Sequence, residues 1–183
     1  VERSFNAITV DGDTSTNDTF LAFAAGEPLP ADQFELLEHG VTLVAQHLAR
    51  AIARDGEGAT CLIEVLVEGA ASEPDALQIA RTVCGSSLVK TAVHGRDPNW
   101  GRIVAAAGRS GVAFDAQVVS LWIGDHQLMQ NGQPLGFDRA AASTYLQERA
   151  NGRYLQDDAV LIRLVVGSGP GKGRSWGCDL SDQ

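Results

Sequence analysis

Residues 55–67 are Asp55-Gly56-Glu57-Gly58-Ala59-Thr60-Cys61-Leu62-Ile63-Glu64-Val65-Leu66-Val67. The last seven are rich in β-branched and other apolar residues, which predicts a strand buried on at least one face, with Glu64 in an outward position. The two glycines before the strand indicate a turn, and they leave Glu57 without neighbouring side-chain bulk. Taken alone, this pattern favours an ordinary helix-stop turn with a solvated Glu57, although such a carboxylate can also face a cavity.

A helix is predicted before this turn. Apolar residues recur at spacings of three and four, at Phe34, Leu37, Val41, Val44, Leu48 and Ile52, and the pattern stops at Gly56. Asp32, followed three residues later by Glu35, predicts a capping box at its start. Residues 5–10 and 20–25 are expected to form two strands joined by the polar turn between them.

Downstream, the order of elements indicates an α+β fold. Ser72-Glu73-Pro74-Asp75 opens a second helix, residues 103–107 form a short helix, and residues 118–123 form a strand. A hairpin around Asn131-Gly132, a helix over about 138–149 and a strand at 160–166 follow. We expect residues 1–85 to continue a main layered domain and residues 86–183 to form a smaller C-terminal α+β domain.

Charge and cysteine content exclude several classes of protein. The chain has 183 residues with Lys+Arg 14 against Asp+Glu 23, a net charge of −9, so no nucleic-acid or anionic-membrane partner is expected. No apolar run reaches the roughly 20 residues that a membrane helix needs. Three separated cysteines without a CxxC pair exclude a complete disulfide framework and a standard structural zinc site, and they fit a reducing, cytoplasmic location.

The glycine-rich stretch 167–173 fails as a nucleotide-binding motif. The Walker pattern needs glycine at Val166 and a hydroxyl residue at Gly173, and the dinucleotide pattern fails as well, so a flexible turn between strands is predicted. The start of a calcium loop at Asp11 is rejected because Thr16 stands where glycine is needed. Local backbone bonding explains most such polar turns, although residues 11–19 could also line a polar pocket.

Two further clusters stay open on sequence alone. No pair of histidines has metal-ligand spacing, so no metal site is expected. His94 is the best histidine candidate for a general base, against the more common role of a surface residue. Asp97, Asn99 and Arg102 around Trp100 could bind a ligand or could fix the connection into the second unit.

Several blocks in order carry a family resemblance. They are Phe5-Asn6 with Ile8-Thr9-Val10-Asp11-Gly12-Asp13-Thr14-Ser15-Thr16-Asn17-Asp18-Thr19, then Asp55-Gly56-Glu57-Gly58-Ala59-Thr60, Ser87-Leu88-Val89-Lys90-Thr91-Ala92, Asp97-Pro98-Asn99-Trp100-Gly101-Arg102 and Trp176-Gly177-Cys178-Asp179-Leu180. With these blocks the chain resembles the β chain of the bifunctional ornithine acetyltransferase/N-acetylglutamate synthase family of arginine biosynthesis. The resemblance spans nearly the whole chain, and it implies layered sheets and helices of the self-cleaving aminopeptidase type.

The resemblance also implies a reaction, a glutamate N-acetyltransferase activity. The family precursor cleaves itself before a threonine, which then carries the acetyl group from N-acetylornithine to glutamate without a metal or coenzyme. That nucleophile is expected upstream of Val1, and a further substrate-contacting Asn is expected beyond Gln183, so no catalytic residue is expected in this chain. The resemblance implies an α chain as partner, which supplies the oxyanion hole, and a dimer of α/β pairs.

Residue by residue, the resemblance carries over one site residue, Glu57, as the carboxylate that binds the substrate ammonium. It thus reverses the interpretation of Glu57 as a solvated turn residue. Cys61 stands where a lysine is frequent in the family, and no mechanism is attached to it. Two rival functions remain, a related N-terminal-nucleophile amidase or aminopeptidase and a non-enzymatic amino-acid-binding module. Whether acetyl-CoA also serves as donor stays open.

Overall fold

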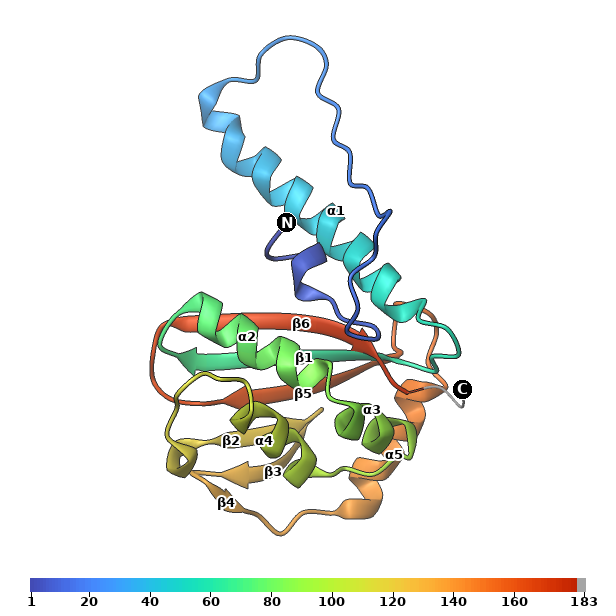
Figure 1. Ribbon diagram of the computed structural model, residues 1–183, viewed down its shortest axis with the longest axis vertical. Coiled ribbons are helices and arrows are strands. Elements are labelled where there is room, and N and C mark those ends of the chain that lie inside the picture. Colours follow the sequence, from blue (N-terminus) through green and yellow to red (C-terminus); the bar gives the residue numbers. More distant parts are fainter. Residues whose placement is uncertain (181–183) are drawn as a thin grey trace.

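The computed structural model describes residues 1–180 and has the predicted α+β class, with helices around one six-stranded sheet in the order β4-β3-β2-β5-β1-β6 (Figure 1). The strands are β1 (Leu62–Ala70), β2 (Ser120–Ile123), β3 (His126–Gln130), β4 (Gln133–Pro134), β5 (Ala159–Val165) and β6 (Gly171–Cys178). The helices are α1 (Phe34–Arg54), α2 (Glu73–Cys84), α3 (Ser87–His94), α4 (Trp100–Gly108) and α5 (Arg139–Ala150). β1 and β5 are parallel, and the other neighbouring strands are antiparallel.

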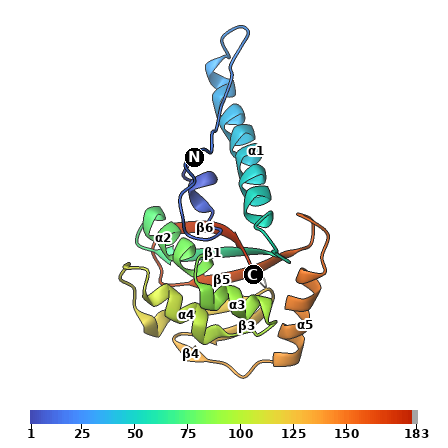
Figure 2. The ribbon, with the colours of Figure 1, turned by 45° about the vertical axis from the view of Figure 1, so that its right-hand side comes forward.

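The central strand β1 is buried on one face, as the sequence predicts. Ile63, Val65 and Val67 are fully buried in the main core, on the face along which α2, α3 and α4 lie (Figure 2). Burying each such side chain stabilises the fold by about 1.5–3 kcal/mol. On the other face, Glu64 pairs with Arg174 at 3.2 Å, which confirms its outward position. The same face also carries the fully buried Leu62, which packs with Trp176 in a second, smaller hydrophobic cluster.

The edge strand β6 follows the predicted glycine turn, and no bounds were predicted for it. Its positions facing α2 are Gly173, Ser175 and Gly177, and a Cβ atom on Gly173 would lie only 2.3 Å from the backbone nitrogen of Leu77. The small residues thus let α2 pack directly on the strand backbone. The predicted glycine turn is confirmed between β5 and β6, but its last three residues belong to the strand.

The predicted strands near the start of the chain are wrong. Residues 5–10 contain a 3₁₀ turn, Phe5–Ala7, and a single bridge between Ile8 and Trp176. Ser175 donates its hydroxyl proton to the carbonyl of Ala7 at 2.6 Å. This segment is therefore held by a few separate hydrogen bonds and not by the continuous backbone pairing of a strand. Residues 20–25 form no strand and lie exposed, because no neighbouring strand in the described part of the chain pairs with them.

Helix α1 confirms the predicted periodicity but not its predicted start. A 3₁₀ turn, Ala31–Gln33, precedes the helix, and Gln33 is the N-cap without a side-chain capping bond. Asp32 lies inside that turn, so the expected capping box does not form. Helix α1 and the loop before it project away from the sheet in both views (Figures 1 and 2).

The remaining predicted elements are confirmed, except that the strand predicted over 118–123 begins at Ser120, because Ala116–Val118 form a 3₁₀ turn. Ser72 caps α2, Asp138 caps α5, and the hairpin between β3 and β4 turns at Asn131-Gly132 with positive φ at both residues. Strands on both sides of the expected boundary near residue 85 join one sheet, so the boundary does not separate two sheets; the division into domains stays a prediction. Among residues 1–180, no helix is long and apolar enough to cross a membrane.

Candidate functional site

The turn that carries Glu57 connects α1 to β1 and is fixed by its two glycines. Gly58 has φ +73°, a conformation that disfavours side chains. A Cβ atom on Gly56 would lie 2.5 Å from the sulfur of Cys178 at the end of β6. Both glycines are therefore required, and the turn packs closely against β6. The side chain of Glu57 is exposed, and it forms no hydrogen bond or ion pair with any residue in 1–180.

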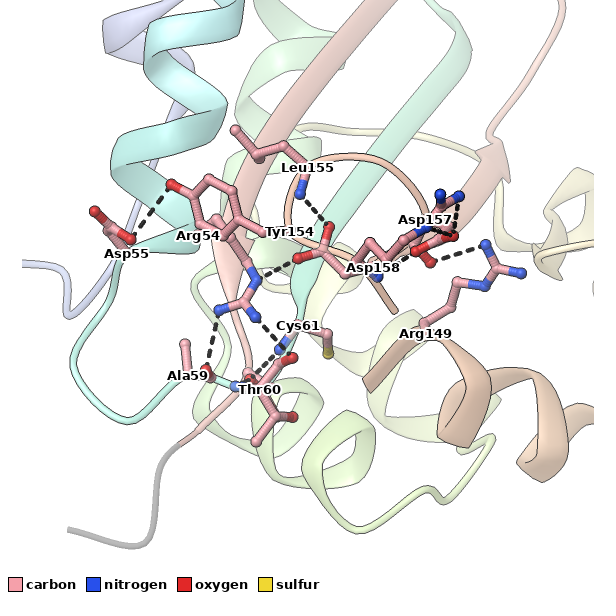
Figure 3. Close-up of polar contacts among 12 residues, drawn as sticks. Arg54, Asp55, Ala59, Thr60, Cys61, Arg149, Tyr154, Leu155, Asp157 and Asp158 are labelled. Atoms are coloured by element: carbon pink, nitrogen blue, oxygen red, sulfur yellow. Dashed lines mark hydrogen bonds and ion pairs between the residues drawn. The ribbon is translucent and has the colours of Figure 1, made fainter. Parts of the chain in front are cut away.

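Arg54, the last residue of α1, holds the segment after the turn (Figure 3). Its guanidinium donates to the carbonyl oxygens of Ala59 at 3.0 Å and Thr60 at 3.1 Å, and its Nε lies 2.5 Å from Oδ2 of Asp158. Asp158 is fully buried and also accepts from the backbone nitrogen of Leu155 at 3.0 Å. The planar fork of arginine suits three acceptors at fixed angles.

Asp179 holds the same segment from the other side. Its carboxylate accepts hydrogen bonds from the backbone nitrogen of Thr60 at 2.7 Å, the hydroxyl of Thr60 at 2.6 Å and the backbone nitrogen of Cys61 at 3.1 Å. The side chain is fully buried. Residues 59–61 thus have two carbonyls bound by Arg54 and two amides bound by Asp179.

Two cationic or titratable side chains face the Asp179 carboxylate. Nδ1 of His94 lies 3.2 Å from Oδ2 and Nη1 of Arg96 lies 3.7 Å from it, while Arg96 also donates to the hydroxyl of Thr60 at 3.0 Å. Burial by itself raises the pKa of Asp179, but the hydrogen bonds from Thr60, Cys61 and His94 outweigh it and hold that pKa below its usual value. The carboxylate is therefore ionised at neutral pH.

His94 was the sequence's candidate for a general base. The structure places it at the end of α3 with its ring against Asp179, and its side chain is 30% exposed. It belongs to the network that holds residues 59–61. The proposed role as a base stays untested.

Lys90 connects three of the sequence blocks that carry the family resemblance. The side chain is buried, its ammonium donates to the carbonyl of Val10, and Nζ lies 3.8 Å from the sulfur of Cys178. Residues that are far apart in the chain therefore meet at the end of β6. This contact ties residue 10 to the sheet.

All three cysteines are free and buried. Burial raises the pKa of Cys61 to about 12, with the nearby Asp179 carboxylate adding to the effect, and burial raises the pKa of Cys84 to about 12. Because the thiolate is the reactive form, we expect native protein to react slowly with a thiol-specific disulfide reagent at pH 8, and these three thiols to react fully after denaturation. Fast labelling of Cys61 in the native protein would contradict this.

In the two other candidate clusters the structure shows contacts within the chain, and a ligand-binding role stays a prediction. In residues 11–19 the contacts are local, such as the backbone nitrogen of Asp13 to the side chain of Asp11 at 2.7 Å. Asn99 caps α4 by accepting from the backbone nitrogen of Arg102 at 3.1 Å, and Arg102 donates to the carbonyl of Leu88 at 3.1 Å. The cluster around Trp100 therefore fixes how α4 follows α3. Within residues 1–180 no group of three or more potential ligands could hold a metal ion.

Sequence reasoning missed the residues that hold the turn, namely Arg54, Arg96, Asp158 and Asp179. Only Asp179 lay in a block that was singled out, and no role was given to it. The signal was weak because the pairs are far apart in the chain: Arg54 and Asp158 are 104 positions apart, and Thr60 and Asp179 are 119 apart. Spacing rules describe neighbours on one element, so they do not detect such pairs.

The chain was compared with known proteins. The ArgJ family profile matches residues 1–183. The chain is 69% identical to the arginine biosynthesis bifunctional protein ArgJ of Prochlorococcus marinus (strain MIT 9313), covering 100% of this chain and 43% of that protein. It is also 69% identical to ArgJ of Parasynechococcus marenigrum (strain WH8102), again over its full length and over 42% of the relative.

A solved structure is similar over nearly the whole chain. The crystal structure of the arginine biosynthesis bifunctional protein ArgJ from Bacillus halodurans superposes with a TM-score of 0.91 at 40% identity. The match covers 99% of this chain and 84% of that chain. The described fold is therefore the fold of that protein over the shared region. The chain spans less than half the length of the curated relatives it matches.

Proposed function

Since this chain belongs to the ArgJ family, we propose that it is the β-chain portion of a glutamate N-acetyltransferase of arginine biosynthesis. The reaction moves an acetyl group from N-acetylornithine to glutamate. In this proposal, Glu57 binds the ammonium group of the amino-acid substrate. The observation that carries the assignment is the exposed carboxylate of Glu57 on a turn whose following residues, 59–61, are hydrogen-bonded to Arg54 and Asp179.

The chemistry divides between this chain and the rest of the protein. A threonine outside this sequence attacks the acetyl carbonyl of N-acetylornithine, ornithine leaves, and the amine of glutamate then takes the acetyl group from the threonine ester. An α chain supplies the oxyanion hole. The part that falls to this chain is to hold the substrate, and Glu57 does so by charge. Neither a metal nor a coenzyme is needed for these steps.

An α-chain partner would cover the apolar stripe of α1. Leu37, Val41, Val44 and Leu48 are each about half exposed or more. Together with the preceding loop they line an open groove of about 520 Å³ whose walls are almost entirely apolar. A contiguous apolar surface of this kind marks an interaction site. We propose that the α chain of the same precursor packs there, that the α/β pairs form a dimer, and that the protein works in the cytoplasm.

Replacing Glu57 by Gln in the complete, processed protein tests the site. The substitution keeps the size of the side chain and removes its charge. Losing one charge-assisted contact costs about 1.5–3 kcal/mol, so kcat/KM for N-acetylornithine is expected to fall by roughly 10- to 100-fold. The thermal midpoint and self-cleavage should be unchanged, because the side chain makes no contact within residues 1–180 that supports the fold.

Glu148→Gln is the matched control, since Glu148 is an exposed carboxylate on α5. It should leave the kinetics unchanged. Unaltered kinetics in Glu57→Gln, or unfolding of that variant, would instead show that Glu57 is an ordinary residue of the helix-stop turn and does not bind substrate.

The rival enzyme class is separated by the reaction assayed. The intact protein should transfer acetyl groups from N-acetylornithine to glutamate, and it should not release free amine from peptides. Peptide hydrolysis without acetyl transfer would favour an amidase or aminopeptidase. Saturable binding of amino acids with neither activity would favour the binding module.

A further inference from the structure

The backbone between the turn and β1 is held more completely than strand pairing requires. β1 already pairs with β5 from Leu62 and with β6 from the same residue. Residues 59–61, just before the paired region, are nevertheless hydrogen-bonded on both sides. Arg54 donates to two of their carbonyl oxygens, and Asp179 accepts from two of their backbone nitrogens. These contacts fix the end of the turn that carries Glu57.

We propose that Asp179, Arg54 and the hydroxyl of Thr60 form a positioning network for the substrate-binding carboxylate. They act on substrate through Glu57 and do not touch it. The inference rests on the proposed function, in which Glu57 binds the substrate ammonium. The network sets the direction in which the turn presents that carboxylate.

The glycines explain why a positioning network is needed. Gly56 and Gly58 flank Glu57 and would leave the unsupported turn with many backbone conformations. Ordering it at the moment of binding would cost free energy that a preorganised turn does not lose. With Gly56 packed against Cys178 on one side and residues 59–61 held on the other, the turn keeps one conformation.

The charges of the network are balanced internally. Arg54 is paired with the buried Asp158, and the Asp179 carboxylate faces Arg96 and His94. In the turn itself, the exposed carboxylates of Glu57 and Asp55 form no ion pair with a described residue, and Asp55 accepts a hydrogen bond from the hydroxyl of Tyr154 at 3.3 Å. A cationic group arriving at the turn is therefore attracted to the turn and not to the network.

The mildest test is a pair of substitutions at Thr60 in the complete, processed protein. Thr60→Val keeps the shape and loses the hydroxyl that donates to Asp179 and accepts from Arg96. We expect KM for N-acetylornithine to rise about fivefold with kcat changed less than about twofold. Thr60→Ser restores the hydroxyl and should restore KM.

Two further variants test the charged members. Asp179→Asn and Arg54→Lys should each raise KM about tenfold or more. An asparagine that keeps its oxygen toward the two backbone nitrogens turns its NH2 group toward His94 and Arg96, and lysine lacks the fork. Asp157→Asn is the matched control: Asp157 is ion-paired with Arg153 near the same site but does not bind residues 59–61, and it should leave KM unchanged. If Asp179→Asn fails to fold, the two Thr60 variants still test the inference.

A double-mutant cycle separates positioning from general stability. In a Glu57→Gln background, Thr60→Val should add less than about twofold to KM, because its effect passes through the removed charge. An additive effect, or equal losses in kcat with a lowered thermal midpoint, would overturn the inference. If Glu57→Gln changes KM and Thr60→Val does not, only the inference fails. If Glu57→Gln itself has no effect, the assignment of Glu57 in the proposed function fails, and the inference with it.

Discussion

Gly173→Ala is expected to destabilise the protein by about 3 kcal/mol or more, because the added methyl group meets backbone and has no side chain to displace. A Cβ atom there would lie 2.3 Å from the nitrogen and 2.7 Å from the Cα of Leu77, and 2.5 Å from the carbonyl carbon of Ala76. To relieve the overlap, α2 must move off β6, and the core residues Ile79 and Val83 that it buries must move with it. The thermal midpoint of the complete protein should fall by roughly 5–10 °C.

Gly136→Ala is the control for this prediction. Gly136 has open space around an added Cβ atom and no positive φ, so its replacement should shift the midpoint by little. An equal, small shift for both variants would mean that α2 does not rest on the backbone of β6.

A charge in the apolar stripe of α1 is expected to have the second large effect. Val44→Asp would place a carboxylate in the groove with Leu37, Val41 and Leu48. Burying an unpaired charge against an apolar partner is strongly unfavourable, so association with the proposed α-chain partner should weaken by about a thousandfold, or about 4 kcal/mol. Co-purification of the two chains followed by size-exclusion chromatography measures this.

Leu88→Asp is the matched control, because Leu88 is an exposed leucine on α3, outside the stripe. Normal assembly of that variant together with loss of assembly in Val44→Asp would support the surface assignment. Normal assembly of both would show that the stripe is not where the α chain packs. The chain expressed without its partner should self-associate or aggregate, since its apolar stripe then stays in water.

Local patterns correctly predicted the elements whose signals are contained within themselves. The run of β-branched and other apolar residues in 61–67 predicted β1, the three-four spacing of apolar residues predicted α1, and Asn131-Gly132 predicted the hairpin. These succeed because periodicity and turn chemistry depend on neighbours along the chain. The same patterns failed for residues 5–10 and 20–25, because a strand needs a partner that periodicity does not supply.

What the sequence by itself determined is the α+β class, most of the elements, the family and Glu57 as the candidate substrate contact. Only the tertiary structure decided that the glycine-rich positions of 171–177 form an edge strand beneath α2, and that Arg54, Asp158, Arg96 and Asp179 hold the turn of Glu57. The physical reason is distance along the chain. A glycine can serve in a turn or under a closely packed helix, and which of the two applies depends on the element that packs against it. A buried ion pair forms between residues that only the folded sheet brings together.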